Sequence, residues 1–155
     1  MTPDLRAIRA FLEPHHHELA RRIGDFAARE LAPLPAPADD ALARTQARDI
    51  LGRLGRAGWY APIGEQQWRA CCLIREALGA ASPLADAVFA LQGLGVVPIL
   101  LAGSEALRKR WIPAVLAGDA MASFAMTEAE AGSDVAAIAT TAGGCPRRCC
   151  LSTFS

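Results

Sequence analysis

The sequence has no excess of either charge, because lysine and arginine together number 16 and aspartate and glutamate also number 16. A balanced chain sets up no net field that would attract nucleic acid or an anionic membrane, so we expect neither as a partner. The cysteines are few, five in all, and an odd number does not fit a disulfide framework. We therefore expect free thiols, a reducing compartment and a cytoplasmic location.

Long apolar runs and short catalytic motifs are also missing. The apolar stretch that ends with residues 99–102 is broken by Pro98 and closed by Gly103, so no segment is expected to span a bilayer. The N-terminus carries Asp4 and Arg6 with no apolar segment behind them, which does not predict a secretory signal. The sequence contains no Ser/His/Asp arrangement, no P-loop and no Gly-x-Gly-x-x-Gly motif.

What the chain does have is 52% apolar residues, which recur at helical spacing until about residue 120. The segment from Ile8 to Leu31 forms one apolar stripe and is followed by three prolines that stop the helix. Asp39 or Asp40 is expected to cap a second helix, with Leu42 on its buried face. A third helix is predicted over residues 68–79.

A fourth helix is predicted from Ser82-Pro83, where a capping hydroxyl precedes a proline at the first helical position. Almost no charge follows Asp86, so this helix is expected to be buried on most sides. Residues 59–64 are expected to form a loop between the second and third helices. Breaks are expected at Gly93, Gly95 and Pro98 and, in a shorter helix that opens at Ser104, at Pro113.

The period changes in the segment Phe124–Asp134, which has the sequence FAMTEAEAGSD. We expect residues 122–127 to form a strand and the small residues that follow to form a turn. Such a turn can direct backbone N–H groups and the hydroxyls of Thr127 and Ser133 at an anionic or carbonyl-rich ligand. Gly132 would allow the backbone to come close or to take a positive φ. The alternative is a plain turn, capped by its own serine and aspartate side chains.

Four other groups of residues have both a functional and a structural interpretation. His15–His17 could bind zinc weakly, but consecutive residues on a helix point in different directions, and we expect a solvated face. Cys145, Cys149 and Cys150 lack a fourth ligand nearby, so no zinc site is expected. Arg108–Arg110 could meet a phosphate or form an exposed, charged helix face. An apolar stripe could be core or the wall of an acyl pocket: Leu84, Val88, Leu91 and Leu94.

The segment Phe124–Asp134 resembles the signature of the acyl-CoA dehydrogenases: an aromatic residue, two small or apolar residues, Thr-Glu-Pro and then Gly-Ala-Gly-Ser-Asp. Residues 92–119, QGLGVVPILLAGSEALRKRWIPAVLAGD, are similar to the stretch that precedes this signature in the family, and the spacing between the two is right. Ala129 replaces the usual proline and Glu130 the usual glycine. The resemblance covers residues 5–142, roughly the first third of a full-length member.

The resemblance implies an all-α domain over residues 1–120 and, over residues 121–142, the first strand and turn of an incomplete β-domain. Members of the family hold FAD and oxidise an acyl-CoA thioester to the 2,3-enoyl-CoA. A glutamate removes the α-proton, which polarisation of the thioester carbonyl makes acidic enough to leave. The resemblance also implies an electron-transfer flavoprotein or a similar acceptor, and a homo-oligomeric full-length enzyme.

Site residues carried over from the family fall into two groups. Gly132 and Ser133 would meet the pyrophosphate of FAD, and Ser133 would also touch the CoA thioester. The flavin ring would lie along four consecutive residues, with the hydroxyl of the last one on its polar edge: Phe124, Ala125, Met126 and Thr127. The fourth helix would form part of the acyl pocket with Val88, Leu91 and Leu94.

The catalytic glutamate of the family, and its second flavin-binding stretch, would lie beyond residue 155. Neither Glu128 nor Glu130 is expected to act as the base, because both lie in the signature turn. The chain alone is therefore expected to bind FAD weakly or not at all and to show no turnover. Residues 143–155 have no apolar period, and we interpret them as an aberrant tail from a frameshifted or truncated gene.

Two other interpretations stay open at this point. Within the same fold, the chain could be part of an acyl-CoA oxidase or of a flavin-dependent monooxygenase. Outside enzyme chemistry, it could be a non-catalytic helical interaction module. An oxidase or a monooxygenase would differ from a dehydrogenase in sequence that lies beyond this chain. An interaction module would bind a partner protein without flavin.

Overall fold

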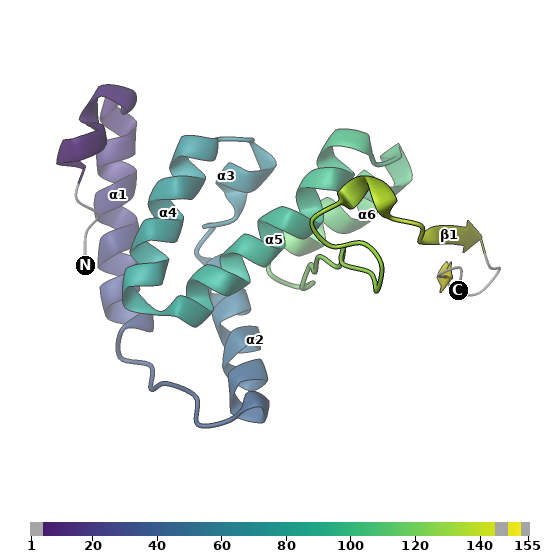
Figure 1. The fold of residues 1–155 in the computed structure, drawn as a ribbon. Helices are drawn as coiled ribbons and strands as arrows, with labels where there is room; N and C mark the ends of the chain where they lie inside the picture. Colours follow the sequence, from purple (N-terminus) through teal and green to yellow (C-terminus); the bar gives the residue numbers. More distant parts are fainter. Residues whose placement is uncertain (1–4, 145–148, 153–155) are drawn as a thin grey trace. The chain divides into compact units, whose positions relative to one another are not determined.

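The computed structural model describes residues 5–144 and 149–152, and the chain divides into two compact units, of which the first ends at Ser123 and the second begins at Phe124 (Figure 1). The expected all-α fold class is confirmed, because helices account for nearly all the regular structure of the first unit. In chain order these are η1 (Arg6–Phe11), α1 (Pro14–Phe26), η2 (a π-helix, Ala27–Leu31), α2 (Asp40–Arg56), α3 (Ala61–Gly64), α4 (Trp68–Ala81), α5 (Pro83–Ala102) and α6 (Glu105–Leu116).

Two helices, α4 and α5, form the centre of the first unit. Helix α4 packs against both α1 and α5, and α5 packs in turn against α2 and α6 (Figure 1). The short helix α3 contacts α4, α5 and α6. The long helix α5 therefore connects the two ends of the domain.

Polar side chains begin three of the helices where the sequence predicted them. The Asp39 carboxylate accepts a hydrogen bond from the Leu42 N–H at 2.8 Å, which caps α2. The hydroxyls of Ser82 and Ser104 each accept an N–H from three residues downstream, at 3.3 Å, and cap α5 and α6. Each cap satisfies a backbone donor that the first turn of the helix leaves without a partner.

The predicted breaks inside the last two helices are wrong. Helix α5 continues through Pro98 and α6 continues through Pro113. Each proline removes one helical hydrogen bond, but the carbonyl freed by Pro98 belongs to Leu94, which is half exposed and open to water. The predicted loop at residues 59–64 is also corrected, since α3 forms there with proline in its first turn.

Several residues expected in the core are exposed. The first predicted stripe is not one helix: Ile8 and Phe11 lie on the separate 3-10 helix η1 and are exposed, as is Leu42 at the start of α2. His16 differs in the opposite sense. It is 4% exposed, not part of a solvated face, and its Nδ1 accepts the Glu13 N–H at 3.0 Å to cap α1.

Helix α5 is buried on one side only, in contrast to the prediction. Its buried face includes Val88, Phe89 and Val96, whereas Leu94 is 50% and Leu101 62% exposed. By length and composition α5 could also cross a membrane, which corrects the expectation that no segment is long enough. Its packing against α2, α4 and α6 is that of a core helix of a helical domain.

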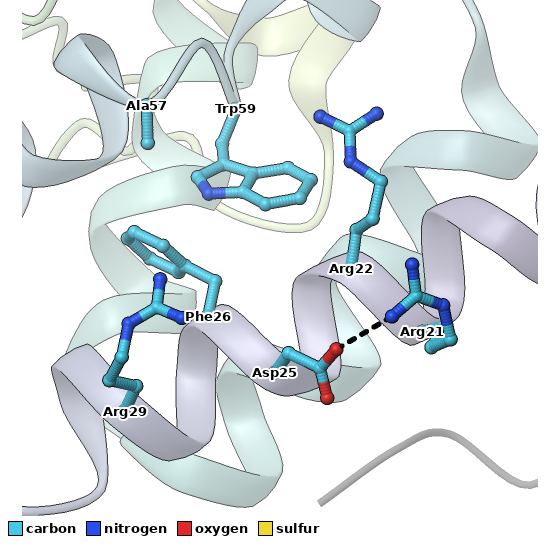
Figure 2. A pocket seen from close by; sticks show the side chains of 7 residues that line it. All are labelled: Arg21, Arg22, Asp25, Phe26, Arg29, Ala57 and Trp59. Carbon is cyan, nitrogen blue, oxygen red and sulfur yellow. Dashed lines mark hydrogen bonds and ion pairs between the residues drawn. The ribbon is translucent and has the colours of Figure 1, made fainter.

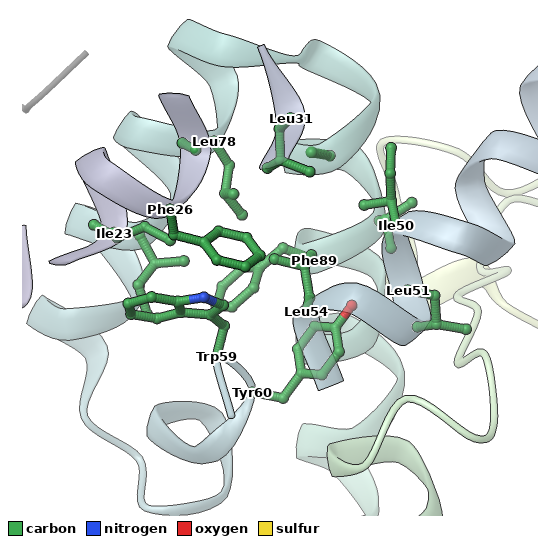
Figure 3. Close-up of a cluster of buried hydrophobic side chains, with 14 of the residues drawn as sticks. Ile23, Phe26, Leu31, Ile50, Leu51, Leu54, Trp59, Tyr60, Leu78 and Phe89 are labelled. Atoms are coloured by element: carbon green, nitrogen blue, oxygen red, sulfur yellow. The ribbon is translucent and has the colours of Figure 1, made fainter. Parts of the chain in front are cut away.

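The core of the first unit lies among α1, α2, α4 and α5 and is built around aromatic rings (Figure 3). Phe26 and Trp59 lie with ring centroids 5.5 Å apart, and Tyr60 stacks on Phe89 at 5.7 Å. Aliphatic side chains fill the space around them: Ile23, Leu31, Ile50, Leu51, Leu54 and Leu78.

One polar side chain, Gln92, is fully buried in this unit. Its amide nitrogen donates to the carbonyl of Val115 at 2.9 Å and to that of Ala120 at 3.0 Å. Its amide oxygen accepts the N–H of Ala122 at 2.6 Å. A single side chain on α5 thus holds the end of α6 and the chain that leaves it.

The second unit contains little regular structure. The predicted strand at residues 122–127 is absent, since no regular element is assigned there and the N–H groups of residues 124–127 have no partner within the described residues. A strand requires a neighbouring strand to accept those groups. A 3-10 turn, η3 (Val135–Ala137), precedes an antiparallel pair of β1 (Thr141–Gly144) and β2 (Cys149–Ser152), in which Thr141 pairs with Ser152. Much of the predicted tail, including residues 145–148 and 153–155, lies outside the described residues.

The Gln92→Leu substitution is expected to destabilise the helical unit strongly. Leucine fills the same space but leaves the Ala120 carbonyl and the Ala122 N–H without partners, and two such groups cost about 2–4 kcal/mol of the free energy of unfolding. Urea denaturation measures this loss. Gln67→Leu, at an exposed site, is the control and is expected to stay within about 0.5 kcal/mol of the parent chain. Equal effects of the two substitutions would contradict the assignment.

The Tyr60→Phe substitution is expected to leave the free energy of unfolding unchanged or to raise it by about 1 kcal/mol. The Tyr60 side chain is fully buried, burial raises the pKa of its phenol, and its hydroxyl has no hydrogen-bond partner in the described part of the chain. Phe89→Leu, which removes the ring stacked on Tyr60, is the matched control and is expected to lose about 1 kcal/mol. A clear destabilisation by Tyr60→Phe would show that the hydroxyl has a partner.

Candidate functional site

The signature segment, Phe124–Asp134, presents hydrogen-bond donors that the described residues do not use. The hydroxyls of Thr127 and Ser133 make no hydrogen bond within the described part of the chain, and both residues are exposed. The backbone N–H groups of residues 124–127 also have no partner among the residues that the structure describes. Apolar side chains lie between these donors, with Phe124 45% and Met126 43% exposed. A row of donors next to exposed apolar groups can hold a flat ligand with polar edges.

The shape of the segment is fixed by Glu128. Its carboxylate accepts the N–H of Ala139 at 2.9 Å and that of Thr140 at 2.8 Å, and its own N–H donates to the Ala131 carbonyl at 2.8 Å. Hydrogen bonds from the Thr140 hydroxyl, and then from the two backbone N–H groups, lower the pKa of Glu128. A carboxylate that is already hydrogen-bonded in its ionised form is a poor proton acceptor.

Gly132 and Asp134 complete the turn, with one departure from expectation. Gly132 does not take a positive φ, and a Cβ there would meet nothing within 4 Å. The structure thus leaves open space in front of Gly132, as close approach of a ligand would need. The capping residue is Asp134, whose carboxylate accepts the Ala136 N–H at 3.2 Å. The Ser133 hydroxyl is not used in the cap.

The residues predicted for the acyl pocket divide between two faces of α5. Val88 is 5% exposed and belongs to the hydrophobic core, so the core interpretation holds for this residue. Leu91 is 37% and Leu94 50% exposed, and both lie on the uncovered face of the helix. The structure therefore leaves two of the three as candidate wall residues.

Two residues that the sequence analysis did not assign to a site, Gly95 and Gln92, bring the chain after α6 against α5. Gly95 lets Ala122 and Ser123 pass against the helix, because a Cβ at this glycine would lie 2.6 Å from the Ala122 Cβ. Gln92 holds the Ala122 N–H one turn earlier. The only available signal was a polar residue and two glycines within an otherwise apolar run.

The remaining candidates are the possible metal ligands and the charged residues Arg108–Arg110. No group of three metal-binding side chains occurs among the residues that were described. Lys109 pairs with Glu105 at 2.6 Å, Arg110 lies 4.8 Å from the Trp111 ring, and Arg108 reaches the Leu101 carbonyl. These three residues form an exposed helix face. Cys145, Cys149 and Cys150 lie where side chains are outside the described residues.

Comparison with known proteins gives a consistent result. Residues 13–119 match the model of the acyl-CoA dehydrogenase N-terminal domain. The chain is 32% identical over 138 residues to a probable acyl-CoA dehydrogenase of Mycobacterium leprae, an alignment that covers 84% of this chain and 35% of the relative. It is 40% identical over 115 residues to an acyl-CoA dehydrogenase of Mycobacterium tuberculosis, with 68% and 27% covered.

A glutaryl-CoA dehydrogenase of Desulfococcus multivorans is 34% identical over 99 residues, which covers 59% of this chain and 25% of that protein. The chain thus spans between a quarter and about a third of the length of these relatives. The matched region contains all of α1 to α6, whose packing and caps are described above. The chain belongs to the acyl-CoA dehydrogenase family, and its helical unit is the N-terminal domain of that family.

Proposed function

We propose that this chain is the N-terminal part of an FAD-dependent enzyme that converts an acyl-CoA thioester to its 2,3-enoyl-CoA. The observation that carries the proposal is the signature segment, with free donors at residues 124–127 and at Ser133, following directly on a helical unit of this family. The relatives named above include a glutaryl-CoA dehydrogenase, whose name specifies a CoA thioester substrate.

The residues present fit one side of a flavin. An isoalloxazine ring has a flat apolar body and a polar edge, and the segment offers exposed Phe124 and Met126 side chains beside the Thr127 hydroxyl. The space in front of Gly132, next to the Ser133 hydroxyl, suits a pyrophosphate. When bound, FAD supplies the hydride acceptor of such a reaction. The role of this chain would be to hold and orient the cofactor.

The acyl chain would lie along the uncovered face of α5. Leu91 and Leu94 are apolar and exposed on that face, whereas Val88 belongs to the core. Large apolar side chains exposed side by side commonly mark a ligand or partner surface. Their position on a rigid helix, close to where Gly95 lets residues 122 and 123 pass, would set the place of the acyl chain.

The base that removes the α-proton would come from outside this chain. Glu128 is engaged by Ala139 and Thr140, and its lowered pKa makes it a weak acceptor. We therefore propose that the chain alone binds FAD weakly and does not turn over. Electron-transfer flavoprotein as acceptor, homo-oligomerisation and a cytoplasmic location belong to the same proposal for the whole enzyme.

The names of the relatives bear on the direction of the proposed reaction. A 3-(aryl)acrylate reductase of Clostridium sporogenes is 28% identical over 135 residues, which covers 81% of this chain and 35% of that protein. Its name describes a reduction, so an N-terminal part of this type is compatible with either direction. We favour dehydrogenation because the family model and the more similar relatives carry that name.

The proposal predicts that the purified chain, incubated with excess FAD and passed over a desalting column, keeps no stoichiometric flavin. It also predicts no acyl-CoA-dependent reduction of an artificial electron acceptor. The physical reason is that only one side of the flavin site is present. The full-length Mycobacterium leprae relative, treated in the same way, is the positive control and should retain its flavin absorption band.

Reading the gene beyond codon 142 in all three frames tests the identity of the whole enzyme. One frame should continue into a second flavin-binding stretch and a helical domain with the base. The absence of such a continuation in every frame would contradict the proposed dehydrogenase. A stoichiometric flavin band with the chain alone would contradict the proposed division of the site.

A further inference from the structure

The start of helix α1 is capped by a side chain that can take up a proton. The Nδ1 atom of His16 accepts the Glu13 N–H at 3.0 Å, and the His16 N–H donates to the Glu13 carbonyl at 2.9 Å. An imidazole nitrogen accepts a hydrogen bond only while it carries no proton. The cap therefore requires the neutral ring, with its single proton on Nε2.

The surroundings of the His16 ring oppose a second proton. The residue is 4% exposed, and burial is the largest cause of its lowered pKa. The His15 ring, 4.0 Å away between centroids, lowers this pKa further, as do Arg69 on α4 and the neighbouring His17. The Glu13 carboxylate acts in the opposite sense and raises it. The sum of these effects, from both α1 and α4, keeps the ring neutral while the cap is closed.

The same junction attaches η1 to the rest of the domain. Arg69 donates to the Phe11 carbonyl at 2.7 Å and to the Glu13 carboxylate at 3.1 Å. Helix η1 has no buried residue, and Phe11 is 70% exposed. Apolar packing therefore contributes little to this attachment, and the polar contacts around Glu13 fix the place where η1 meets α1.

Beyond its first turn, α1 is anchored independently of His16. Phe26 belongs to the hydrophobic core, and its ring lies beside Trp59 (Figure 2). On the solvent side Arg21 pairs with Asp25 at 3.1 Å, which Figure 2 marks with a dashed line. Opening of the cap can therefore loosen the first turn of α1 without unfolding the domain.

A hollow gives water access to this junction. It has a volume of about 440 Å³ and lies between the first residues of α1 and those of α4, with His16, Trp68 and Arg69 in its lining. A proton can therefore reach the His16 ring from solvent while the helical unit stays folded.

We propose that His16 is a pH-sensitive switch, whose neutral ring fixes η1 at the start of α1 and whose protonation releases η1 while the rest of the helical unit stays folded. A proton on Nδ1 turns this atom into a donor facing the Glu13 N–H, so the proton and the cap exclude each other. In the released segment the ring has the pKa of a solvated histidine, about 6.5.

The direction of the pH dependence follows from these two states. The pKa of the His16 ring is lower in the capped state than in the released one. The released state therefore binds more protons, and acid favours it. The capped state has its full advantage above about pH 6.5 and loses it progressively as the pH falls below that value.

The test follows the backbone amides of the whole chain by nuclear magnetic resonance between pH 7.5 and pH 5. The chain has three histidines, and histidine is the only side chain whose ordinary pKa lies in this range. The protection factor of the Glu13 amide, taken relative to an unstructured chain at the same pH, should fall about fivefold, as expected for loss of a helix cap. Amides in the core of α5 should not change. The midpoint of the release should coincide with the titration of the His16 ring signals.

Two substitutions separate the switch from a general effect of acid. His16→Gln supplies an amide oxygen that can accept the same N–H, as glutamine does at this position of a capping box, and that takes up no proton in this range. This variant should keep its Glu13 protection within about twofold between pH 7.5 and pH 5. His17→Gln removes the exposed neighbour and should respond to pH as the parent chain does.

Three results would overturn the proposal. These are constant protection of Glu13 between pH 7.5 and pH 5, the same pH response in His16→Gln as in the parent chain, and a midpoint of release that differs from that of the His16 ring. If glutamine does not close the cap, so that η1 is released at both pH values, the two midpoints of the parent chain still decide.

Discussion

The buried amide of Gln92 is the constraint on which the rest of this structure depends. It lies on α5, the helix that connects both ends of the domain, and it joins α5 to the end of α6 and to the chain that leads out of the helical unit. A buried amide that loses a partner is costly, so the three hydrogen bonds fix the position of Ala122. Gly95, one turn further along α5, removes the side chain that would otherwise block this path.

The proposed functional residues fall into two groups, one on the packed helix α5 and one in the signature segment. The exposed leucines of α5 are held by a packed core, whereas the signature segment begins immediately after the last residue that the helical unit holds. Glu128 gives that segment a local shape, and its remaining donors have no partners in the described chain. The structure is therefore that of a packed helical domain followed by a segment that we propose forms one side of a flavin site. The family model matches the helical domain, residues 13–119, and the chain covers about a third of the first relatives' length.

Features that depend on neighbouring residues could be predicted from the sequence, and features that depend on distant partners could not. The caps at Asp39, Ser82 and Ser104 follow from side chains that bond to backbone groups three residues away. The hydrogen bonds of Gln92 reach residues 23 to 30 positions away, and all three partners are backbone groups, which the sequence does not mark.

The breaks predicted at Pro98 and Pro113 are wrong, because packing in the folded domain outweighs the low helix propensity of proline. The strand predicted at residues 122–127 failed because its pairing partner is not in the described chain. Among the predicted site residues, Leu91 and Leu94 are exposed, and their place in an acyl pocket stays a proposal. Val88 is buried in the core, which periodicity alone could not tell, because it does not say which face of the helix meets its neighbours.

Hydrogen–deuterium exchange, read residue by residue, tests most directly the claim that Gln92 ends the cooperative helical unit at Ala122. The account predicts that the Ala122 amide exchanges as slowly as the core of α5, because it opens only when the unit unfolds. It predicts at the same time that the amides of residues 124–127 exchange close to the rate of an unstructured chain. Fast exchange at Ala122, or protection that extends through residues 124–127, would contradict it.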